Sequence, residues 1–275
     1  MLTCNRAQYI SRAIESILCQ RFQEWELIVV HDGLNGPTEA IMNEWTARDN
    51  RIRYFHRLQL GNIANACNYG IARARGEYIA ILDDDDYWAR PDKLEKQVAF
   101  LAKQPEYAGC GGGLTIVDPD GNALMSYLKH EEDSSIRGKA LSANPMNHST
   151  SMFRRAYWEA AGGYDESLAG FQDWDLWLKL GHLGRLYNFP EVFAYYTMWD
   201  GCGSYQQHRR NTRSAIRIVL RHREAYAGFT LAFPLVLLQH AYAYLPSPVR
   251  RYSFSFLSLL KKRLFAERKA RLKAA

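Results

Sequence analysis

The chain has 275 residues, 47% of them hydrophobic, which is enough to bury one large core. Its five cysteines are scattered and odd in number, which argues against a disulfide framework or a zinc site, and its first residues lack the pattern of a secretory signal. We therefore expect one main domain in a reducing cytoplasm.

The net charge of +6 belongs to the end of the chain. Residues 249–275 hold nine Lys or Arg against one acid, Glu267, so the remainder is slightly negative. A nucleic-acid binder could use such a tail. However, few polar residues that could read bases are interleaved with these charges, and we expect no nucleic-acid partner.

Helix-like and strand-like patterns alternate over the first hundred residues. Apolar residues recur at helical spacing over 10–18, and short apolar runs at 26–30, 51–55 and 77–82 are typical of buried strands. Helices are predicted between and after these runs, over 37–49, 63–74 and 91–104. This order predicts an α/β fold with a doubly wound, mostly parallel, Rossmann-like sheet that binds ligands at the carboxyl ends of its strands.

The pattern is weaker beyond Pro105. We expect strands over 107–112, 114–117 and 149–153, a turn over 118–121, a polar loop over 130–147, and helices over 154–163 and 173–181. The opening "MLTCN" has too few apolar residues for a central strand. The first strand is therefore either very short or begins upstream of this sequence.

Four aspartates follow one predicted strand in "ILDDDDYW", residues 81–88. On an extended backbone, Asp83 and Asp85 would point to the same side and converge on one ion. Carboxylate oxygens suit Mg²⁺ or Mn²⁺, and two of them leave coordination positions for phosphate oxygens. The alternative is a solvated acidic turn before the next helix. Spacing alone does not separate these two interpretations.

Three longer segments are informative together: "LTCNRAQYISRAIESILCQRFQEWELIVVHDGLNG", "GIARARGEYIAILDDDDYWARPDKLEKQVAFL" and "GGYDESLAGFQDWDLWLKL". In order and spacing, over about residues 2–200, they resemble the family 2 glycosyltransferases of the GT-A fold. The resemblance implies a nucleotide-diphosphate-sugar donor, a Mg²⁺ or Mn²⁺ ion held by a D-x-D motif, and an inverting single displacement. We expect a catalytic domain over 1–200, with a donor half (1–105) and an acceptor half (106–200).

The resemblance also implies roles for residues on the donor side. The metal ligands are Asp83 and Asp85, while Asp83 and Asp84 also reach the donor. The other donor-binding positions are Thr3, Asn5, Asp32 and Asn68. For Asp32, which matches the acid that bonds the donor's base, the alternative is a turn-forming residue. Cys4 replaces a common aromatic, and Cys67 replaces the Arg of an R-N-x-G pattern.

On the acceptor side, the resemblance makes Asp173 the catalytic base, with Gln172 in place of a usual Glu. An inverting transfer needs such a carboxylate opposite the leaving group. The alternative for Asp173 is a helix N-cap. His148 matches a histidine near the active site, although a lone histidine is often structural. The departures at Cys4, Cys67 and Gln172 leave a donor-binding domain with weak or no catalysis as the alternative function.

Residues 201–275 are predicted to form a helical extension beyond the resemblance. Residues 225–249 carry no formal charge when His is neutral, but Pro234, Gln239 and His240 interrupt the apolar run, which argues against a simple spanning helix. The basic tail that follows favours a helix lying on an anionic membrane surface. A buried helix and a spanning segment are the alternatives. We expect a cytoplasmic protein, peripheral at the inner face of the membrane, acting on a saccharide or lipid-linked acceptor of the cell envelope.

Overall fold

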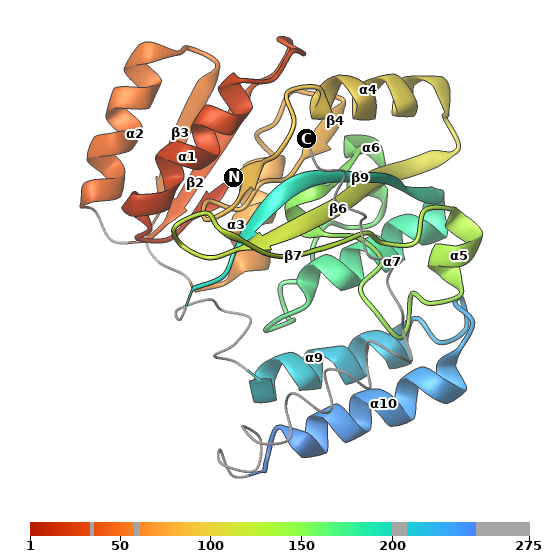
Figure 1. Cartoon of the computed structure of the whole chain (residues 1–275). Helices are drawn as coiled ribbons and strands as arrows, with labels where there is room; N and C mark the ends of the chain where they lie inside the picture. The colour runs from red at the N-terminus through yellow and green to blue at the C-terminus, as the bar shows by residue number, and fades with distance from the viewer. Residues whose placement is uncertain (34–35, 58–60, 200–207, 246–275) are drawn as a thin grey trace.

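The computed structural model describes residues 1–33, 36–57, 61–199 and 208–245 (Figure 1). Its first half alternates strands and helices as the sequence predicts. The elements are β1 (Leu2–Thr3), α1 (Ala7–Leu18), β2 (Leu27–Asp32), α2 (Pro37–Arg48), β3 (Ile52–Arg57), α3 (Ile63–Ile71), β4 (Tyr78–Ala80) and α4 (Lys93–Lys103). In α1, apolar residues at three- and four-residue spacing form the buried face: Ile10, Ala13, Ile14 and Ile17.

The first three strands form a parallel sheet in the order β1-β2-β3. β1 is two residues long, and it pairs Leu2 with Val30 and Thr3 with His31. Parallel strands end at the same edge of a sheet. This register therefore brings the segment after Thr3 next to Asp32, the last residue of β2.

The second sheet is mixed, which differs from the mostly parallel sheet predicted. Its strand order is β4-β8-β6-β9-β5, with β7 beside β6, and among its described strand pairs only β6 and β9 are parallel. The tight turn at 118–121 produces the antiparallel β6–β7 pair. The elements not yet given are β5 (Tyr87–Trp88), β6 (Tyr107–Val117), β7 (Ala123–Tyr127), α5 (Asp133–Arg137), η1 (His148–Thr150), β8 (Met152–Arg154), α6 (Arg155–Ala160), α7 (Gln172–Leu183) and β9 (Arg185–Thr197).

The long strands β6 and β9 depart most from the sequence prediction. β6 is one strand where two were expected, and the pattern does not predict β9, which contains Pro190. A Cβ atom on Gly112 would lie 2.6 Å from Phe193 of β9, and one on Gly111 would lie 2.7 Å from Asn188. The glycines that weaken the strand pattern of β6 therefore allow β9 to pack closely against it.

A cavity of about 220 Å³ lies where β2 and β4 face each other, and its lining includes Leu27, Ile28, Ile79 and Ile81. In the described part of the chain β4 is an edge strand, paired with β8 alone. The short β1 pairs only with the carboxyl-terminal half of β2, so the sheet is divided in two at this point. The lining continues to Asp83 and His148, which connects the cavity to the aspartate cluster.

The helices α9 (His208–Arg221) and α10 (Phe229–Tyr242) form a layer next to α7, below the sheets in Figure 1. Trp174 and Leu178 of α7 share a buried apolar cluster with Ile218 and Val219 of α9. No helix in the described residues is long and apolar enough to cross a membrane. The division into a domain over 1–200 and an extension over 201–275 stays a prediction.

An ion-pair cluster also joins α7 to α9. The buried Asp175 carboxylate accepts hydrogen bonds from Arg221 Nη1 at 2.8 Å and from His222 Nε2 at 3.0 Å, and it lies 3.0 Å from Lys179 Nζ. These charges outweigh the effect of burial and lower the pKa of Asp175. The extension is therefore anchored to the helix that carries the predicted catalytic base.

Lys93 is an unusual buried charge at the start of α4. Its side chain is fully buried, its Nζ donates to Gln97 Oε1 at 2.7 Å, and it lies 4.1 Å from the centre of the Trp88 ring. Burial lowers its pKa to about 7 from a usual value of 10.5. Between these two pH values the unfolded chain holds a proton on this lysine that the folded chain has released.

Replacing Lys93 with Met should therefore change how stability depends on pH. Above pH 7, Lys93 of the wild-type chain keeps its proton in the unfolded state and loses it in the folded state. The free energy of unfolding therefore rises with pH, by about 2 kcal/mol between pH 7 and pH 9. Urea unfolding of both proteins at the two pH values measures this. We expect Lys93→Met to reduce that rise. Loss of the contact to Gln97 should change the free energy of unfolding by the same amount at pH 7 and at pH 9, so it does not affect the difference between them. An unchanged slope would contradict the prediction.

Candidate functional site

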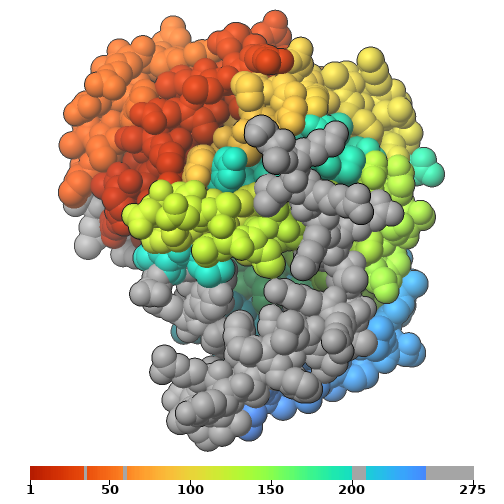
Figure 2. All heavy atoms as spheres, viewed as in Figure 1, coloured from red at the N-terminus to blue at the C-terminus, as the bar shows by residue number. Residues whose placement is uncertain are grey.

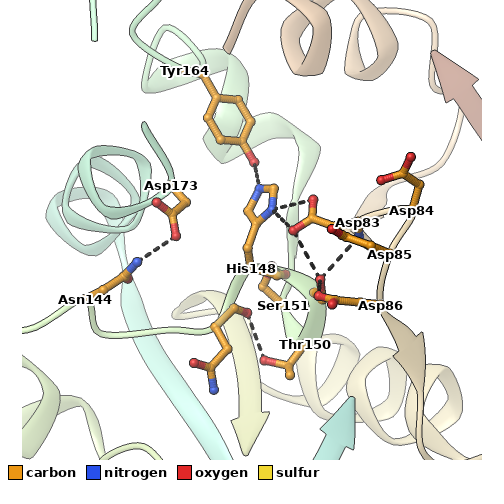
Figure 3. Close-up of polar contacts among 12 residues, drawn as sticks. Asp83, Asp84, Asp85, Asp86, Asn144, His148, Thr150, Ser151, Tyr164 and Asp173 are labelled. Atoms are coloured by element: carbon orange, nitrogen blue, oxygen red, sulfur yellow. Dashed lines mark hydrogen bonds and ion pairs between the residues drawn. The ribbon is translucent and has the colours of Figure 1, made fainter. Parts of the chain in front are cut away.

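The four consecutive aspartates lie in a turn and not in a strand. β4 ends at Ala80, and the Asp86 amide donates to the Asp83 carbonyl at 3.1 Å, which closes the turn. The alternation of an extended backbone therefore does not apply to Asp83 and Asp85. Figure 3 shows Asp83, Asp85 and Asp86 near His148 and Asp84 turned away from them. The structure thus separates the four carboxylates, although by a different geometry from the one expected.

Asp83 is paired with His148. The imidazole Nδ1 lies 3.1 and 3.3 Å from the two carboxylate oxygens of Asp83, and Nε2 lies 2.9 Å from the hydroxyl of Tyr164 (Figure 3). Burial by itself would raise the pKa of Asp83, but the charge of His148 outweighs it and the pKa is lowered. Likewise, burial would lower the pKa of His148, but the Asp83 carboxylate raises it. Each group therefore favours the charged form of the other.

Asp84 and Asp85 share a single arginine. Arg6 Nη1 lies 2.7 Å from Asp84 Oδ1 and 2.9 Å from Asp85 Oδ2, and Trp199 Nε1 donates to the same Asp85 oxygen at 3.1 Å. The Arg6 guanidinium also lies 5.8 Å from the centre of the Trp199 ring. Asp84 is buried.

Asp86 holds the aspartate turn against the neighbouring elements. Its carboxylate is buried, and it accepts hydrogen bonds from the Ser149 hydroxyl at 2.5 Å and from the Thr197 amide at 3.1 Å. Burial, followed by repulsion from Asp83 and Asp85, raises the pKa of Asp86 well above its usual value. Asp86 thus connects the aspartate turn to η1 and to the end of β9.

The electrostatics of the turn fit a divalent cation. Burial raises the pKa of Asp84 to about 7 despite the charge of Arg6, and burial and repulsion from Asp83 also raise the pKa of Asp85. Arg6 alone faces both carboxylates, so their negative charge is only partly balanced, and carboxylate oxygens match the preference of Mg²⁺ and Mn²⁺. No group of three or more His, Cys, Asp or Glu in the described residues could hold a metal ion.

The predicted nucleotide-binding residues Thr3, Asn5 and Asp32 come together at the edge of the first sheet. Asn5 has a positive φ of 56°, and its Oδ1 lies 3.4 Å from Nε2 of His31. A Cβ atom on Gly33 would lie 2.6 Å from that same Asn5 oxygen, so only glycine allows this approach. Thr3 and Asp32 are both buried. A hydrogen bond from Thr3 is among the interactions that lower the pKa of Asp84, so Thr3 connects this edge to the aspartate turn.

Asn68 lies in α3, and its amide group bonds to the protein itself. Its Nδ2 donates to the Tyr164 carbonyl at 3.0 Å and to Glu166 Oε1 at 2.9 Å, while its Oδ1 accepts from the Tyr164 amide at 2.9 Å. In this structure Asn68 fixes the loop that carries Tyr164, the partner of His148. A direct contact of Asn68 with the donor stays a prediction.

Asp173 lies in the first turn of α7, next to Gln172, the first residue of that helix. The N-cap position belongs to Phe171, so the alternative role of Asp173 as N-cap is not what the structure shows. Asn144 Nδ2 donates to Asp173 Oδ2 at 2.6 Å (Figure 3), and the negative charge of Asp173 contributes to the raised pKa of His148. Asp173 is thus within electrostatic reach of the pair formed by His148 and Asp83.

Sequence reasoning missed four residues of this site: Arg6, Asn144, Ser149 and Trp199. The arginine in "TCNRAQ" and the serine after His148 were visible as polar residues beside predicted site positions. Asn144 lies in the stretch 130–147 that was predicted only as a loop. Trp199 follows β9, a strand that the pattern did not predict, so no signal pointed to it.

Residues 1–162 match the model of the family described as "Glycosyl transferase family 2". The chain belongs to this family. It is 35% identical over 184 residues to an uncharacterized glycosyltransferase of Rickettsia conorii; the match covers 64% of this chain and 30% of that relative. The predicted family is thereby confirmed. The matched residues 1–162 contain the first two sequence segments and end where the third begins. This family 2 chain spans about a third of the length of that relative.

Two solved structures share the fold of this family 2 chain. Residues 1–349 of TarS of S. aureus, in complex with UDP-GlcNAc, have a TM-score of 0.69 at 18% identity, covering 95% of this chain and 76% of that TarS chain. The mannosyltransferase PcManGT of Pyrobaculum calidifontis, in complex with GDP-Man and Mn²⁺, has a TM-score of 0.64 at 18% identity, covering 94% and 78%. At this identity the likeness shows the fold alone, and it confirms the predicted α/β fold of the GT-A type.

Proposed function

We propose that this chain transfers a sugar from a nucleotide-diphosphate-sugar to an acceptor hydroxyl, with inversion at C1 of the sugar and with Mg²⁺ or Mn²⁺. The observation that carries the proposal is that Asp173 and the pair of Asp83 with His148 share one electrostatic neighbourhood. A proton acceptor and a metal-binding carboxylate are the two groups that such a displacement needs on opposite sides of the reacting sugar.

In the proposed reaction, the acceptor oxygen forms a bond to C1 while the bond from C1 to the diphosphate oxygen breaks. Asp173 takes the proton of the acceptor hydroxyl, and the nucleoside diphosphate leaves with the electron pair of the broken bond. The hydrogen bond from Asn144 at 2.6 Å orients the carboxylate of Asp173.

On the donor side, Asp83 and Asp85 would hold the metal, which when bound stabilises the charge on the leaving diphosphate. His148 fixes the orientation of Asp83, and Arg6 reduces the repulsion between Asp84 and Asp85. Thr3, Asn5 and Asp32, which lie together at the sheet edge, would bind the nucleoside. Polar side chains at the carboxyl edge of parallel strands suit this role, because ligands of such sheets bind there.

The proposed setting is cell-envelope polysaccharide or glycolipid synthesis at the cytoplasmic face of a membrane, with a saccharide or lipid-linked acceptor. The sequence prediction of membrane binding rests on the basic tail. This tail lies outside the described residues, which end at Leu245. The domain division at residue 200 belongs to the same proposal.

A thermal-shift screen tests the donor and the metal together. With Mg²⁺ or Mn²⁺, at least one of the UDP-, GDP- and dTDP-sugars should raise Tm by about 5 °C when its concentration is about 100 times Kd. Chelation of the metal should remove most of this shift. If no nucleotide sugar changes Tm with either metal, the proposed function is wrong.

A further inference from the structure

The helix α10 is apolar on both its faces. Its 14 residues include no Asp, Glu, Lys or Arg, and Ala232 and Val236 are buried against the rest of the protein. On the outer side, Leu231 is 54% exposed, Leu238 is 63% exposed and Leu245, just after the helix, is 42% exposed. A helix that is apolar all round is normally buried on both sides. The outer side of α10 therefore requires an explanation.

Part of the exposed surface of α10 is one apolar stripe. Positions 231, 234, 238, 241 and 245 are exposed, and their spacing of three or four residues places them on one face of the helix. Thr230, Leu237 and Gln239 are exposed as well. We call this face, from Leu231 to Leu245, the leucine stripe. α10 forms the outer edge of the molecule in Figure 2, at the lower right.

Arginines of α9 lie beside the leucine stripe. Arg209 lies 4.7 Å from the centre of the Tyr244 ring, and Arg213 Nη2 donates to the Tyr244 hydroxyl at 3.1 Å. Both arginines are exposed, as are Arg210 and Arg217. Residues 208–245 contain six arginines and one acid, Glu224. Arg221 is paired with Asp165 and Asp175, and Arg223 with Glu224, so the positive charge beside the stripe comes from Arg209 and Arg213.

We propose that the leucine stripe and the arginines of α9 form a docking surface for an anionic lipid membrane. Apolar side chains next to arginines match the boundary between acyl chains and anionic headgroups. At 14 residues, α10 is about 21 Å long, and the hydrocarbon core is about 30 Å thick, so the helix lies along the surface. A second copy of the chain fits less well, because a two-fold interface here would bring two arginine-rich helices together.

The biological purpose of this docking rests on the proposed function, because a docked chain would hold its candidate site close to a lipid-linked acceptor. Physically it is independent of that function, because vesicle binding needs neither donor nor metal. It also differs from the sequence prediction, because it assigns membrane binding to described residues of α9 and α10 and not to the basic tail.

Sedimentation of the full chain with vesicles tests the proposal. We expect binding to phosphatidylcholine vesicles that contain about one third phosphatidylglycerol, and binding at least about 10-fold weaker to pure phosphatidylcholine. The double variant Leu231→Ser, Leu238→Ser should weaken binding by about 10-fold or more, because each leucine loses its transfer out of water. The matched control is Leu124→Ser, Met125→Ser in β7, which removes two comparably exposed apolar side chains elsewhere. That control should bind like the wild-type chain.

Each other outcome overturns the proposal. Absence of binding by the wild-type chain would refute it, and undiminished binding by the α10 variant would assign binding to another segment. An equal loss in both variants would show a non-specific effect, and a dimer that the α10 variant disrupts would assign the stripe to a second copy. The donor-dependent Tm shift of each variant should match the wild-type shift. A failure of the membrane proposal is thereby distinguished from a failure of the proposed function.

Discussion

Replacing Asp173 with Asn should lower the rate of donor turnover by about 100-fold or more and leave donor binding almost unchanged. The amide has nearly the shape of the carboxylate but cannot accept the acceptor's proton, and general-base catalysis contributes about 10²- to 10⁴-fold. Release of the nucleoside diphosphate measures turnover, with water as the acceptor if no better one is found. The Tm shift with donor and metal measures binding.

Two further variants make the Asp173 experiment specific. Asn144→Ala removes the hydrogen bond to Asp173 at 2.6 Å, and it should lower turnover less than Asp173→Asn because the carboxylate remains. Asp120→Asn changes an exposed carboxylate in the turn between β6 and β7, and it should have no effect. If Asp173→Asn turns over the donor as fast as the wild-type chain, Asp173 is not the base. A wild-type chain without measurable turnover would support the alternative of a donor-binding domain.

Replacing Asp85 with Asn should abolish the metal-dependent part of donor binding. Loss of a residue that orients a metal ligand typically costs about 10- to 100-fold in affinity, and loss of the ligand itself should cost at least about 100-fold. The measurement is the donor Kd with Mg²⁺ or Mn²⁺ and with chelator. In the variant these two values should converge.

The same variant should remain folded, which separates loss of the site from loss of structure. Burial and repulsion from Asp83 raise the pKa of Asp85, so its ionised form is held against the preference of its surroundings. Removing the charge should therefore leave Tm without metal unchanged or higher. Arg6 keeps its contact with Asp84 at 2.7 Å. If Asp85→Asn retains metal-dependent donor binding, Asp85 is not a metal ligand.

Local patterns were sufficient for the elements of the first half. The apolar spacing of α1 and the β-branched run of β2 reflect burial of one helix face and of a central strand, and both depend on neighbouring residues only. The second half was less predictable. β6 is rich in glycine because β9 packs closely against it, and such a contact between distant segments leaves no periodic signal.

In the candidate site, too, the contacts between residues that are distant in the sequence could not be predicted. The sequence indicated that the acids after β4 lie at a ligand-binding edge, but it suggested a strand where the chain forms a turn. Consequently it could not show that Asp86 is buried by Ser149 and Thr197 while Asp84 bonds to Arg6. These partners are more than sixty residues away from the turn in the sequence.

The family and the α/β fold class could be predicted from the sequence alone, because motifs and local hydrophobic periodicity indicate them. The same holds for the segments that make up the candidate site. Which polar side chains meet became visible only in the folded chain: Asp83 with His148, Asp173 with Asn144, and Arg6 with Asp84 and Asp85. Electrostatic interactions act over a few ångströms, so pairs distant in the sequence become visible only when the packed elements fix the distances between them.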